Sequence, residues 1–371
     1  MIRRFFIVLM LIFSHAAIAD EAADKAEFQK LYAQFNDLYA NSKDLDPIIA
    51  VAEKVYELGQ QVYGKDHMNT AVVTYNLASL YSEKGEKTQN GELSVKASRL
   101  YNDYFKILDD NDVPKDNTYI NQYLQYIKTL AFDDRSRSIH ATANKVIGFA
   151  KDANYNDAEM ASLEFNVGLL LFKNTDYQKS KSHFERASEL FETAYGPDNY
   201  NVGEAEFWVA KLDMGTNSNS RAETHFLKAL DIFKKNPEKS KKLTENTHAF
   251  LVAIYEEMDR SQEATLHCKA IAEERPKDFD QFIKPLYRKK PIYPAQQART
   301  GNSGEVLLEF DVDTDGFTRN VRVIESSSKN FESASIKAAE GYRYAPSIQN
   351  GELVVTKGAR VLIKYRLYKS R

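Results

Sequence analysis

Along most of the chain, apolar residues recur at the three- and four-residue spacing of an amphipathic helix. Phe184, Ala187, Leu190 and Phe191 form one such stripe, which a helix must bury against a neighbour. The alanine of this pattern, Ala-x-x-aliphatic followed by another apolar residue, returns at intervals of 41 to 46 residues. These alanines are Ala52, Ala97, Ala143, Ala187, Ala229 and Ala270. The pattern predicts a series of similar helix pairs.

One amphipathic helix pair cannot bury its apolar face alone, so repeated pairs stack and share a continuous core. We therefore expect residues 20–281 to form an all-α solenoid in which the small alanines let neighbouring helices approach closely. Ala270 continues the series but is followed by Glu273 and Glu274. That ending fits a terminal repeat with a polar outer face.

A second repeated segment supports the same period. Tyr63-Gly64-Lys65-Asp66-His67 matches Tyr195-Gly196-Pro197-Asp198-Asn199, which lies 132 residues further on, or three periods of 44. These units resemble tetratricopeptide (TPR) repeats of the long-helix kind over about residues 24–276. HEAT-like repeats share the period, so the solenoid class is better determined than the family. The resemblance implies a surface that binds partner proteins and carries no chemistry.

Beyond residue 281, apolar and polar residues alternate as they do in strands. Residues 304–312 and 318–325 are predicted as two strands joined at Asp315-Gly316, because an Asp-Gly pair tolerates the positive φ of a hairpin turn. A helix is expected over residues 331–341, and one or two strands within residues 352–368. This order predicts a small ββαβ domain whose mixed sheet keeps an open edge. The whole chain is then an α+β multidomain protein.

The boundary between the two regions is expected near residues 277–285, where Pro276 and Pro285 stop helices. The net charge changes there, from −12 over residues 20–281 to +7 over residues 282–371. Basic residues near the two ends of the second region are Lys284, Arg288, Lys289, Lys290, Lys364, Arg366, Lys369 and Arg371. They either attract acidic partners or lipid head groups, or keep a solvated strand from aggregating edge to edge.

The first nineteen residues have the composition of an export signal. Arg3 and Arg4 precede an apolar run from Phe5 to Phe13, and Ala17-Ile18-Ala19 is a small-x-small cleavage signal before Asp20. Nine apolar residues are too few to span a bilayer, which needs about 20. We expect residues 1–19 to be a signal peptide and the protein to be periplasmic. The alternative is an uncleaved anchor in the inner membrane that faces the periplasm.

Few side chains suggest catalysis or metal binding. The one cysteine, Cys268, excludes an intramolecular disulfide and a zinc cage built from cysteines. Asp311-x-Asp313-x-Asp315-Gly316 begins like a calcium loop, but Arg322 stands where that loop needs its bidentate acid. His267 beside Cys268 has no second ligand nearby, and the other histidines are dispersed singly, so we interpret the pair as helix packing residues. With no catalytic triad or phosphate loop, we expect no enzyme activity, metal or cofactor.

Six short motifs in residues 282–371 occur in the order found in the TonB C-terminal domain. They are Tyr293-Pro294, Gly304-Glu305-Val306, Phe310-Asp311-Val312, Asp315-Gly316, Val321-Arg322-Val323 and Tyr342-Arg343-Tyr344-Ala345-Pro346. The region resembles that family over its whole length. It departs from the family at Lys290 and Ile292, which replace the glutamines flanking Tyr-Pro, and in its lack of a proline-rich rod.

The resemblance implies a periplasmic domain that grips the TonB box, a short extended segment of an outer-membrane receptor. The segment joins the sheet edge as an added strand, so main-chain hydrogen bonds provide the affinity. Proton-motive force from the inner membrane is thereby passed to the receptor for uptake of a siderophore or similar nutrient. The contact residues expected from the resemblance are Tyr293, Pro294, Ala359, Arg360, Val361, Leu362, Ile363, Lys364, Tyr365, Arg366 and Leu367.

The implied partners are the TonB-dependent receptor and either the inner-membrane motor proteins or a membrane-anchored TonB, and nucleic acid is excluded by the compartment. A rival hypothesis stays open, because the repeats take the place of the rod and a cleaved signal leaves no membrane helix to reach a motor. In that hypothesis the protein is a periplasmic interaction scaffold for envelope assembly or secretion. Its TonB-like domain then binds no receptor and transduces no energy.

Overall fold

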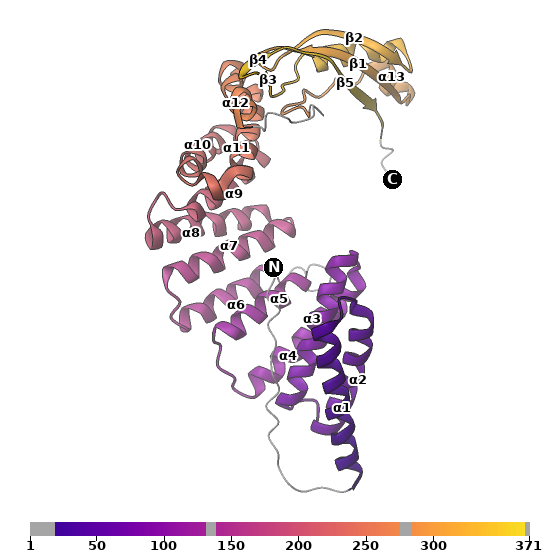
Figure 1. Cartoon of the computed structure of the whole chain (residues 1–371), viewed down its shortest axis with the longest axis vertical. Coiled ribbons are helices and arrows are strands. Elements are labelled where there is room, and N and C mark those ends of the chain that lie inside the picture. The colour runs from indigo at the N-terminus through magenta and orange to yellow at the C-terminus, as the bar shows by residue number, and fades with distance from the viewer. Residues whose placement is uncertain (1–18, 131–138, 275–283, 368–371) are drawn as a thin grey trace. The chain divides into compact units, whose positions relative to one another are not determined.

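The computed structural model describes residues 19–130, 139–274 and 284–367 (Figure 1). The chain forms two compact units, Met1–His183 and Phe184–Arg371. Apart from Ala19, the expected signal peptide lies outside the described residues, and so does the expected domain boundary between residues 281 and 282. Both stay predictions.

The first unit is built from helices that follow one another along the chain, each packed on the next. These helices are α1 Ala19–Asn41, α2 Leu45–Tyr63, α3 Met68–Thr88, α4 Gly91–Asp110, α5 Asn117–Thr129, α6 Ile139–Asp152 and α7 Asp157–Lys173. Polar residues fix where several of them begin. The side chains of Asp44, His67, Asn90, Asp116 and Asn156 accept hydrogen bonds from backbone N–H groups of the first turn, which otherwise have no partner within the helix.

The second unit continues the helix pairs and ends in the sheet domain. Helix α8 Tyr177–Tyr195 runs from the first unit into the second. The helices that follow are α9 Tyr200–Gly215, α10 Asn219–Lys235, α11 Pro237–Glu257 and α12 Ser261–Glu274. The first five alanines of the repeated pattern are all buried, so the predicted stack of TPR-like helix pairs is confirmed.

The assignment of Ala270 to the repeated pattern was wrong. Ala270 is half-buried, whereas Ile271 is fully buried at the position equivalent to Ala229. Phe226 and Cys268 are the matching core residues one turn earlier in α10 and α12. The alanine spacing alone could not distinguish two adjacent positions, and only the burial of neighbouring residues fixes the 42-residue register.

Histidines of the repeats pair across neighbouring helices at equivalent positions. In the first unit, the Nδ1 atom of His183 lies 2.6 Å from a carboxylate oxygen of Glu164. In the second unit, the Nδ1 atoms of His248 and His267 lie 2.7 Å apart. The expectation that His267 has no second ligand nearby was wrong, because His248, 19 residues earlier in the sequence, meets it only when the two helices pack.

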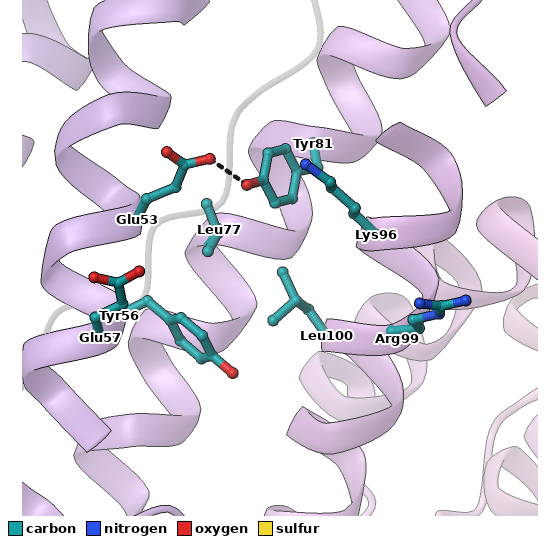
Figure 2. Close-up of a pocket in the computed structure, with 8 residues that line it drawn as sticks. All are labelled: Glu53, Tyr56, Glu57, Leu77, Tyr81, Lys96, Arg99 and Leu100. Carbon is teal, nitrogen blue, oxygen red and sulfur yellow. Dashed lines mark hydrogen bonds between the residues drawn. The ribbon is translucent and has the colours of Figure 1, made fainter. Parts of the chain in front are cut away.

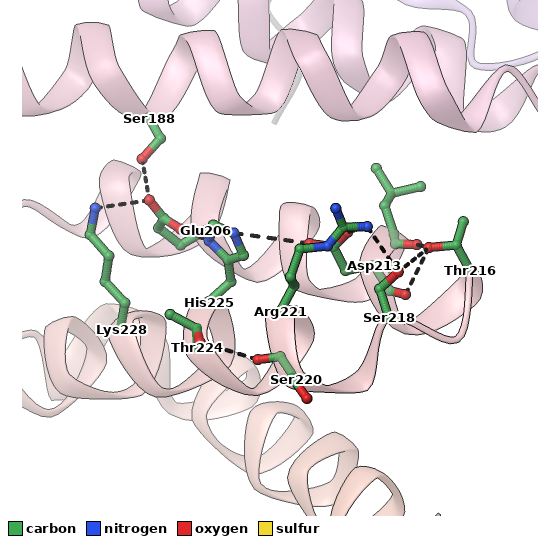
Figure 3. A network of polar contacts seen from close by, with 11 residues as sticks. Ser188, Glu206, Asp213, Thr216, Ser218, Ser220, Arg221, Thr224, His225 and Lys228 are labelled. Atoms are coloured by element: carbon green, nitrogen blue, oxygen red, sulfur yellow. Dashed lines mark hydrogen bonds and ion pairs between the residues drawn. The ribbon is translucent and has the colours of Figure 1, made fainter.

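Glu206 is the centre of a buried polar network that joins three helices of the second unit (Figure 3). Its carboxylate accepts hydrogen bonds from Ser188 Oγ of α8 at 2.7 Å and from Lys228 Nζ of α10 at 2.9 Å, and it lies 2.5 Å from His225 Nδ1. Burial alone would raise the pKa of Glu206, but these hydrogen bonds outweigh it and lower the pKa to about 2. The ionised carboxylate therefore holds α8, α9 and α10 together.

The C-terminal region forms the expected α+β domain. Its elements are α13 Ala295–Thr300, β1 Gly304–Val312, β2 Thr318–Ser326, the 3-10 turn η3 Lys329–Phe331, α14 Glu332–Ala339, β3 Ser347–Gln349, β4 Glu352–Val354 and β5 Thr356–Tyr365. The main sheet has the order β2-β1-β5 and is entirely antiparallel, so the prediction of a mixed sheet was wrong. A small hairpin of β3 and β4, which turns at Asn350-Gly351 with positive φ at both residues, adds to the expected ββαβ order.

One face of the sheet packs on α14 and supplies the core of the domain. Alternate residues of β1, among them Val306, Leu308 and Phe310, are fully buried with Phe331, as the alternation of a half-buried strand requires. Among the described residues, no helix combines the length and the apolar character that crossing a membrane demands.

We expect the stability of the second unit to fall in acid mainly through Glu206. Its folded pKa of about 2 lies below the ordinary value of 4.5, so its contribution is complete above pH 4.5 and disappears as the pH falls towards 2. The difference is worth about 3 kcal/mol. The free energy of unfolding, followed by fluorescence of the single tryptophan Trp208 on α9, should therefore fall more steeply with acid in the wild type than in Glu206→Gln.

Glu192→Gln is the matched control, because Glu192 contacts the same Lys228 at 3.4 Å but is about half exposed. It should leave the acid dependence close to that of the wild type. Parallel curves for the wild type and Glu206→Gln would contradict the assignment.

Candidate functional site

Strand β5 lies at the edge of the main sheet, with β1 as its single strand partner among the described residues. The two strands pair without interruption from Gly304 opposite Tyr365 to Phe310 opposite Ala359. An edge strand presents the backbone N–H and C=O groups that point away from its partner. Seven successive residues of β5 therefore offer a regular row of hydrogen-bonding groups.

The expected contact residues on β5 divide between the two faces of the sheet. Ala359, Val361, Ile363 and Tyr365 point towards α14 and pack in the core of the domain. The intervening residues Arg360, Leu362 and Lys364 lie exposed on the opposite face. The inward residues can therefore meet a partner mainly through their backbone, while the outward ones also present side chains.

Charged side chains join the three strands on the exposed face. The buried carboxylate of Glu309 on β1 accepts a hydrogen bond from Arg360 Nε of β5 at 2.8 Å and another from Arg322 of β2. The hydrogen bond from Arg360, together with the charge of Arg322, lowers the pKa of Glu309. Lys364 Nζ lies 3.6 Å from Glu305 at the other end of the strand. These contacts hold β5 in register with β1.

Tyr293 and Pro294 lie at the carboxyl end of β5. The Tyr293 ring packs edge-on against Tyr365, with ring centroids 5.3 Å apart, and its hydroxyl donates a hydrogen bond to the carbonyl of Asn302 at 2.6 Å. Pro294 is the N-cap of α13. The structure thus brings Tyr293 and Pro294 beside β5. Tyr293 is half-buried there, and its contacts hold the segment before α13 against the strand. Arg366 and Leu367 follow the strand and are exposed.

The other edge of the sheet is irregular. The pairing of β2 with β1 shifts register twice, between Leu307 and Leu308 and between Glu309 and Asp311. Asn320 of β2 has a positive φ of 52°. Bulges of this kind bend a strand and interrupt its ladder of hydrogen bonds, which protects an edge from accepting another strand.

Arg343 fixes the sheet domain on the last helix pair. Its side chain is completely buried, and its guanidinium donates hydrogen bonds to the Glu256 carboxylate of α11, to Thr265 Oγ1 of α12 at 2.7 Å and to the carbonyl of Asp315 at 2.9 Å. The same guanidinium stacks 3.8 Å from the centre of the Phe317 ring. A buried charge is tolerated only when it is paired and hydrogen-bonded in this way.

Apolar contacts and a second ion pair complete this interface. Ile271 and Ala272 of α12 pack with Ala345, and the hairpin residues Ile348 and Leu353 lie against them. Lys269 Nζ of α12 lies 2.6 Å from Asp315 Oδ1 at the turn between β1 and β2. The expectation that the terminal repeat has a polar outer face was therefore wrong, because the sheet domain covers the apolar residues of α12.

Sequence reasoning missed the roles of Arg343 and Glu309. The sequence signal for Arg343 was its place between two aromatic residues, Tyr342 and Tyr344. Such a position is expected to be buried, and a buried guanidinium needs a hydrogen-bonding or charged partner. The acids at the turn after β1 also have partners: Asp313 Oδ1 accepts hydrogen bonds from the backbone N–H groups of Asp315 and Phe317. In the part of the chain that the structure describes, no three His, Cys, Asp or Glu side chains are placed to hold a metal ion.

Comparisons with known proteins give matches in different parts of the chain. Residues 289–367 match the family described as Gram-negative bacterial TonB protein C-terminal. A TonB protein of Pseudomonas aeruginosa is 28% identical over 93 residues, which are 25% of this chain and 27% of that protein. A clustered mitochondria protein homolog of Aspergillus clavatus is 24% identical over 189 residues, which are 50% of this chain and 14% of that protein.

Among solved structures, the TPR-like repeats of a Podosopora anserina putative kinesin light chain cover 60% of this chain and 100% of their own, with 8% identity and a TM-score of 0.44. The matched residues span about a quarter of the length of the Pseudomonas aeruginosa TonB protein. They span 14% of the length of the Aspergillus clavatus protein. The predicted resemblance to the TonB C-terminal domain, joined to TPR-like repeats, is confirmed.

We expect Arg343→Met to loosen the contact between the sheet domain and α12. Removing the guanidinium leaves the largely buried Glu256 carboxylate without its cation, although Ser261 Oγ still donates a hydrogen bond to it; breaking a buried ion pair costs about 3–5 kcal/mol. Cys268, the single cysteine, is fully buried beside Gly316 at this contact, and burial raises the pKa of its thiol to about 12. Labelling of Cys268 by a thiol reagent in the native full-length chain should therefore accelerate about 100-fold or more.

Arg319→Met is the matched control, since Arg319 is an exposed arginine of the same domain that pairs with Asp313 at 2.8 Å. It should change the labelling rate only slightly. The double variant Arg343→Met, Glu256→Gln removes both charges and should recover part of the protection. A labelling rate for Arg343→Met equal to that of the wild type would show that Arg343 does not hold the contact closed.

Proposed function

We propose that the C-terminal domain binds the TonB box of an outer-membrane receptor by accepting it as a strand beside β5. The observation that carries the proposal is the regular edge of β5, which pairs with β1 over seven successive residues and has no second strand partner among the described residues. Main-chain groups of such an edge bind an extended segment of almost any sequence. The match of residues 289–367 to the TonB C-terminal family supports the same assignment.

Side chains on β5 select the segment through cross-strand neighbours. On the face towards α14, an added strand would extend the row formed by Val361 and Ile363, which favours apolar residues. On the exposed face its neighbours would be Arg360, Leu362 and Lys364. Arg360 is bound to Glu309 and Lys364 pairs with Glu305, so Leu362 is the one of the three whose side chain can select the segment without breaking an ion pair. Tyr293 and Pro294 close the carboxyl end of the site.

In this proposal the protein works in the periplasm, where the TPR-like repeats recruit partners and the sheet domain engages the receptor during energised uptake of a nutrient such as a siderophore. It acts beside a membrane-anchored TonB or the inner-membrane motor proteins. The repeats take the place of the family's proline-rich rod and offer a surface that binds partner proteins. A chain anchored in the inner membrane would serve the same receptor.

The rival proposal is a scaffold for envelope assembly or secretion without energy transduction. It is favoured by the burial of Arg343 against Glu256 and Thr265, which makes the sheet domain a cover for the last helix pair. For this reason, deleting residues 282–371 would not separate the two proposals, since the deletion also uncovers Ile271 and Ala272. The separating experiment must leave the domain folded and block only the edge.

Peptides methylated on backbone nitrogens test the added strand. In a strand, only every second amide points to a given neighbour, so two peptides of one TonB-box sequence, N-methylated at odd or at even positions, present different faces to β5. One of them should bind like the parent peptide, and the other should lose binding at least about tenfold, because each blocked hydrogen bond costs about 1 kcal/mol. Calorimetric titration of the full-length chain measures both.

Hydrogen exchange locates the edge in the same complex. Binding of the parent peptide should slow exchange at alternate amides between Ala359 and Tyr365, because the intervening amides already bond to β1. Amides of β2, the irregular edge, serve as the internal control and should not change. Equal binding of the two methylated peptides, or new protection confined to β2, would contradict strand addition at β5.

A further inference from the structure

A hollow of ≈ 310 Å³ lies among three consecutive helices of the first unit, α2, α3 and α4. The residues that line it are Glu53, Tyr56, Glu57, Leu77, Tyr81, Lys96, Arg99 and Leu100, all shown in Figure 2. Its volume is at the lower end of the range for ligand sites in proteins. It is large enough to receive a side chain together with the groups that flank it.

Helices α2 and α4 are the second helices of two successive pairs, and α3 packs against both of them. The hollow therefore lies between the two second helices, α2 and α4, and residues of α3 form its bottom. Leu77 and Leu100 give it an apolar base, and the rings of Tyr56 and Tyr81 stand at its sides (Figure 2). The Tyr81 hydroxyl donates a hydrogen bond to the Glu53 carboxylate, which fixes that ring in place.

The two walls carry opposite charges. Glu53 and Glu57 stand one turn apart on α2, and Lys96 and Arg99 stand one turn apart on α4 (Figure 2). The Lys96 ammonium lies 5.4 Å from the centre of the Tyr81 ring. Within the described residues, neither cation and neither acid of the hollow forms an ion pair.

Like charges one turn apart on a helix repel by a few tenths of a kcal/mol, and each wall contains such a pair. Glu53 is compensated in part by the Tyr81 hydroxyl and Lys96 by the Tyr81 ring, and Asp103, one turn after Arg99 on α4, lies close enough to raise the pKa of Tyr56. Glu57, Lys96 and Arg99 are all exposed. What the charges do create is a field across an apolar base, negative at α2 and positive at α4, and a bound group of matching polarity would be held by both walls.

We propose that this hollow binds an extended segment of a partner protein with the pattern basic-x-apolar-x-acidic. In an extended chain every second side chain points the same way, and four residues span about 13 Å. Such a segment, lying from α2 to α4, places its basic side chain at Glu57, its apolar side chain on Leu77 and Leu100, and its acidic side chain at Lys96 and Arg99. This deepens the proposed role of the repeats in recruiting partners and rests on no property of the β5 edge.

The test uses the full-length chain with labelled leucine methyl groups and three capped pentapeptides. Lys-Gly-Leu-Gly-Glu should shift the methyl signals of Leu77 and Leu100 in a saturable titration. Glu-Gly-Leu-Gly-Glu and Lys-Gly-Leu-Gly-Lys should bind at least about fivefold more weakly, because each then places one charge against a like wall. Rising salt should reduce the preference, since these charges are exposed to solvent.

Reversing one wall gives the sharper test. Lys96→Glu with Arg99→Glu makes both walls acidic, so the variant should prefer Lys-Gly-Leu-Gly-Lys over Lys-Gly-Leu-Gly-Glu by at least about fivefold. Both residues are exposed, and circular dichroism should show an unchanged fold. Lys106→Glu is the matched control, because Lys106 is an exposed lysine of the same helix that does not line the hollow. It should leave the order of the three affinities unchanged.

The proposal fails if the bipolar peptide leaves both methyl signals unmoved at about 10 mM. It also fails if the three peptides bind equally or if the reversed wall does not reverse the preference. None of these results bears on the edge of β5, which belongs to the other unit. Conversely, a failure of strand addition there would leave the titrations at Leu77 and Leu100 unaffected.

Discussion

Every helix pair of this chain has an apolar face that only a neighbour can cover, and the last pair is no exception. Helix α12 carries Ile271 and Ala272 as apolar residues, and Ala345 of the sheet domain packs on them and buries them in place of a further repeat. Arg343 joins the two parts because a completely buried guanidinium needs partners that only α11, α12 and the β1–β2 turn can supply. The sheet domain is thus both the end of the solenoid and the carrier of the open edge.

The two edges of the sheet show how one small domain can be selective about where it accepts another chain. Strand β2 is bulged twice and carries Asn320 at positive φ, so its outer groups do not form a regular ladder. Strand β5 keeps one register with β1 from Ala359 to Tyr365, supported by the contact of Arg360 with Glu309 and by the packing of Ile363 and Tyr365. Regularity on one side and irregularity on the other leave a single row of groups that a partner strand can match.

The sequence predicts features that depend on local periodicity and misses those that depend on meetings between distant elements. Strand β1 and the turn at Gly316 were predicted correctly because alternation and Asp-Gly chemistry are local signals. Strand β3 has three residues and no alternation to detect. The pairs that histidines form across helices, and the partners of Arg343, follow from helix packing, which no short window of sequence contains. The hollow between α2 and α4 belongs to this second class, since its walls are about 40 residues apart in the sequence.

The division of net charge between the regions is not what holds the sheet domain to the repeats. Among the described residues, the ion pair of Arg343 with Glu256 places the cation on the sheet domain, and that of Lys269 with Asp315 places it on the repeats. Their contributions to the charge difference therefore cancel, and the apolar packing and the hydrogen bonds of Arg343 provide the attachment. The excess positive charge of residues 282–371 is not used in these two ion pairs. This charge therefore attracts an acidic partner that approaches the sheet from solution.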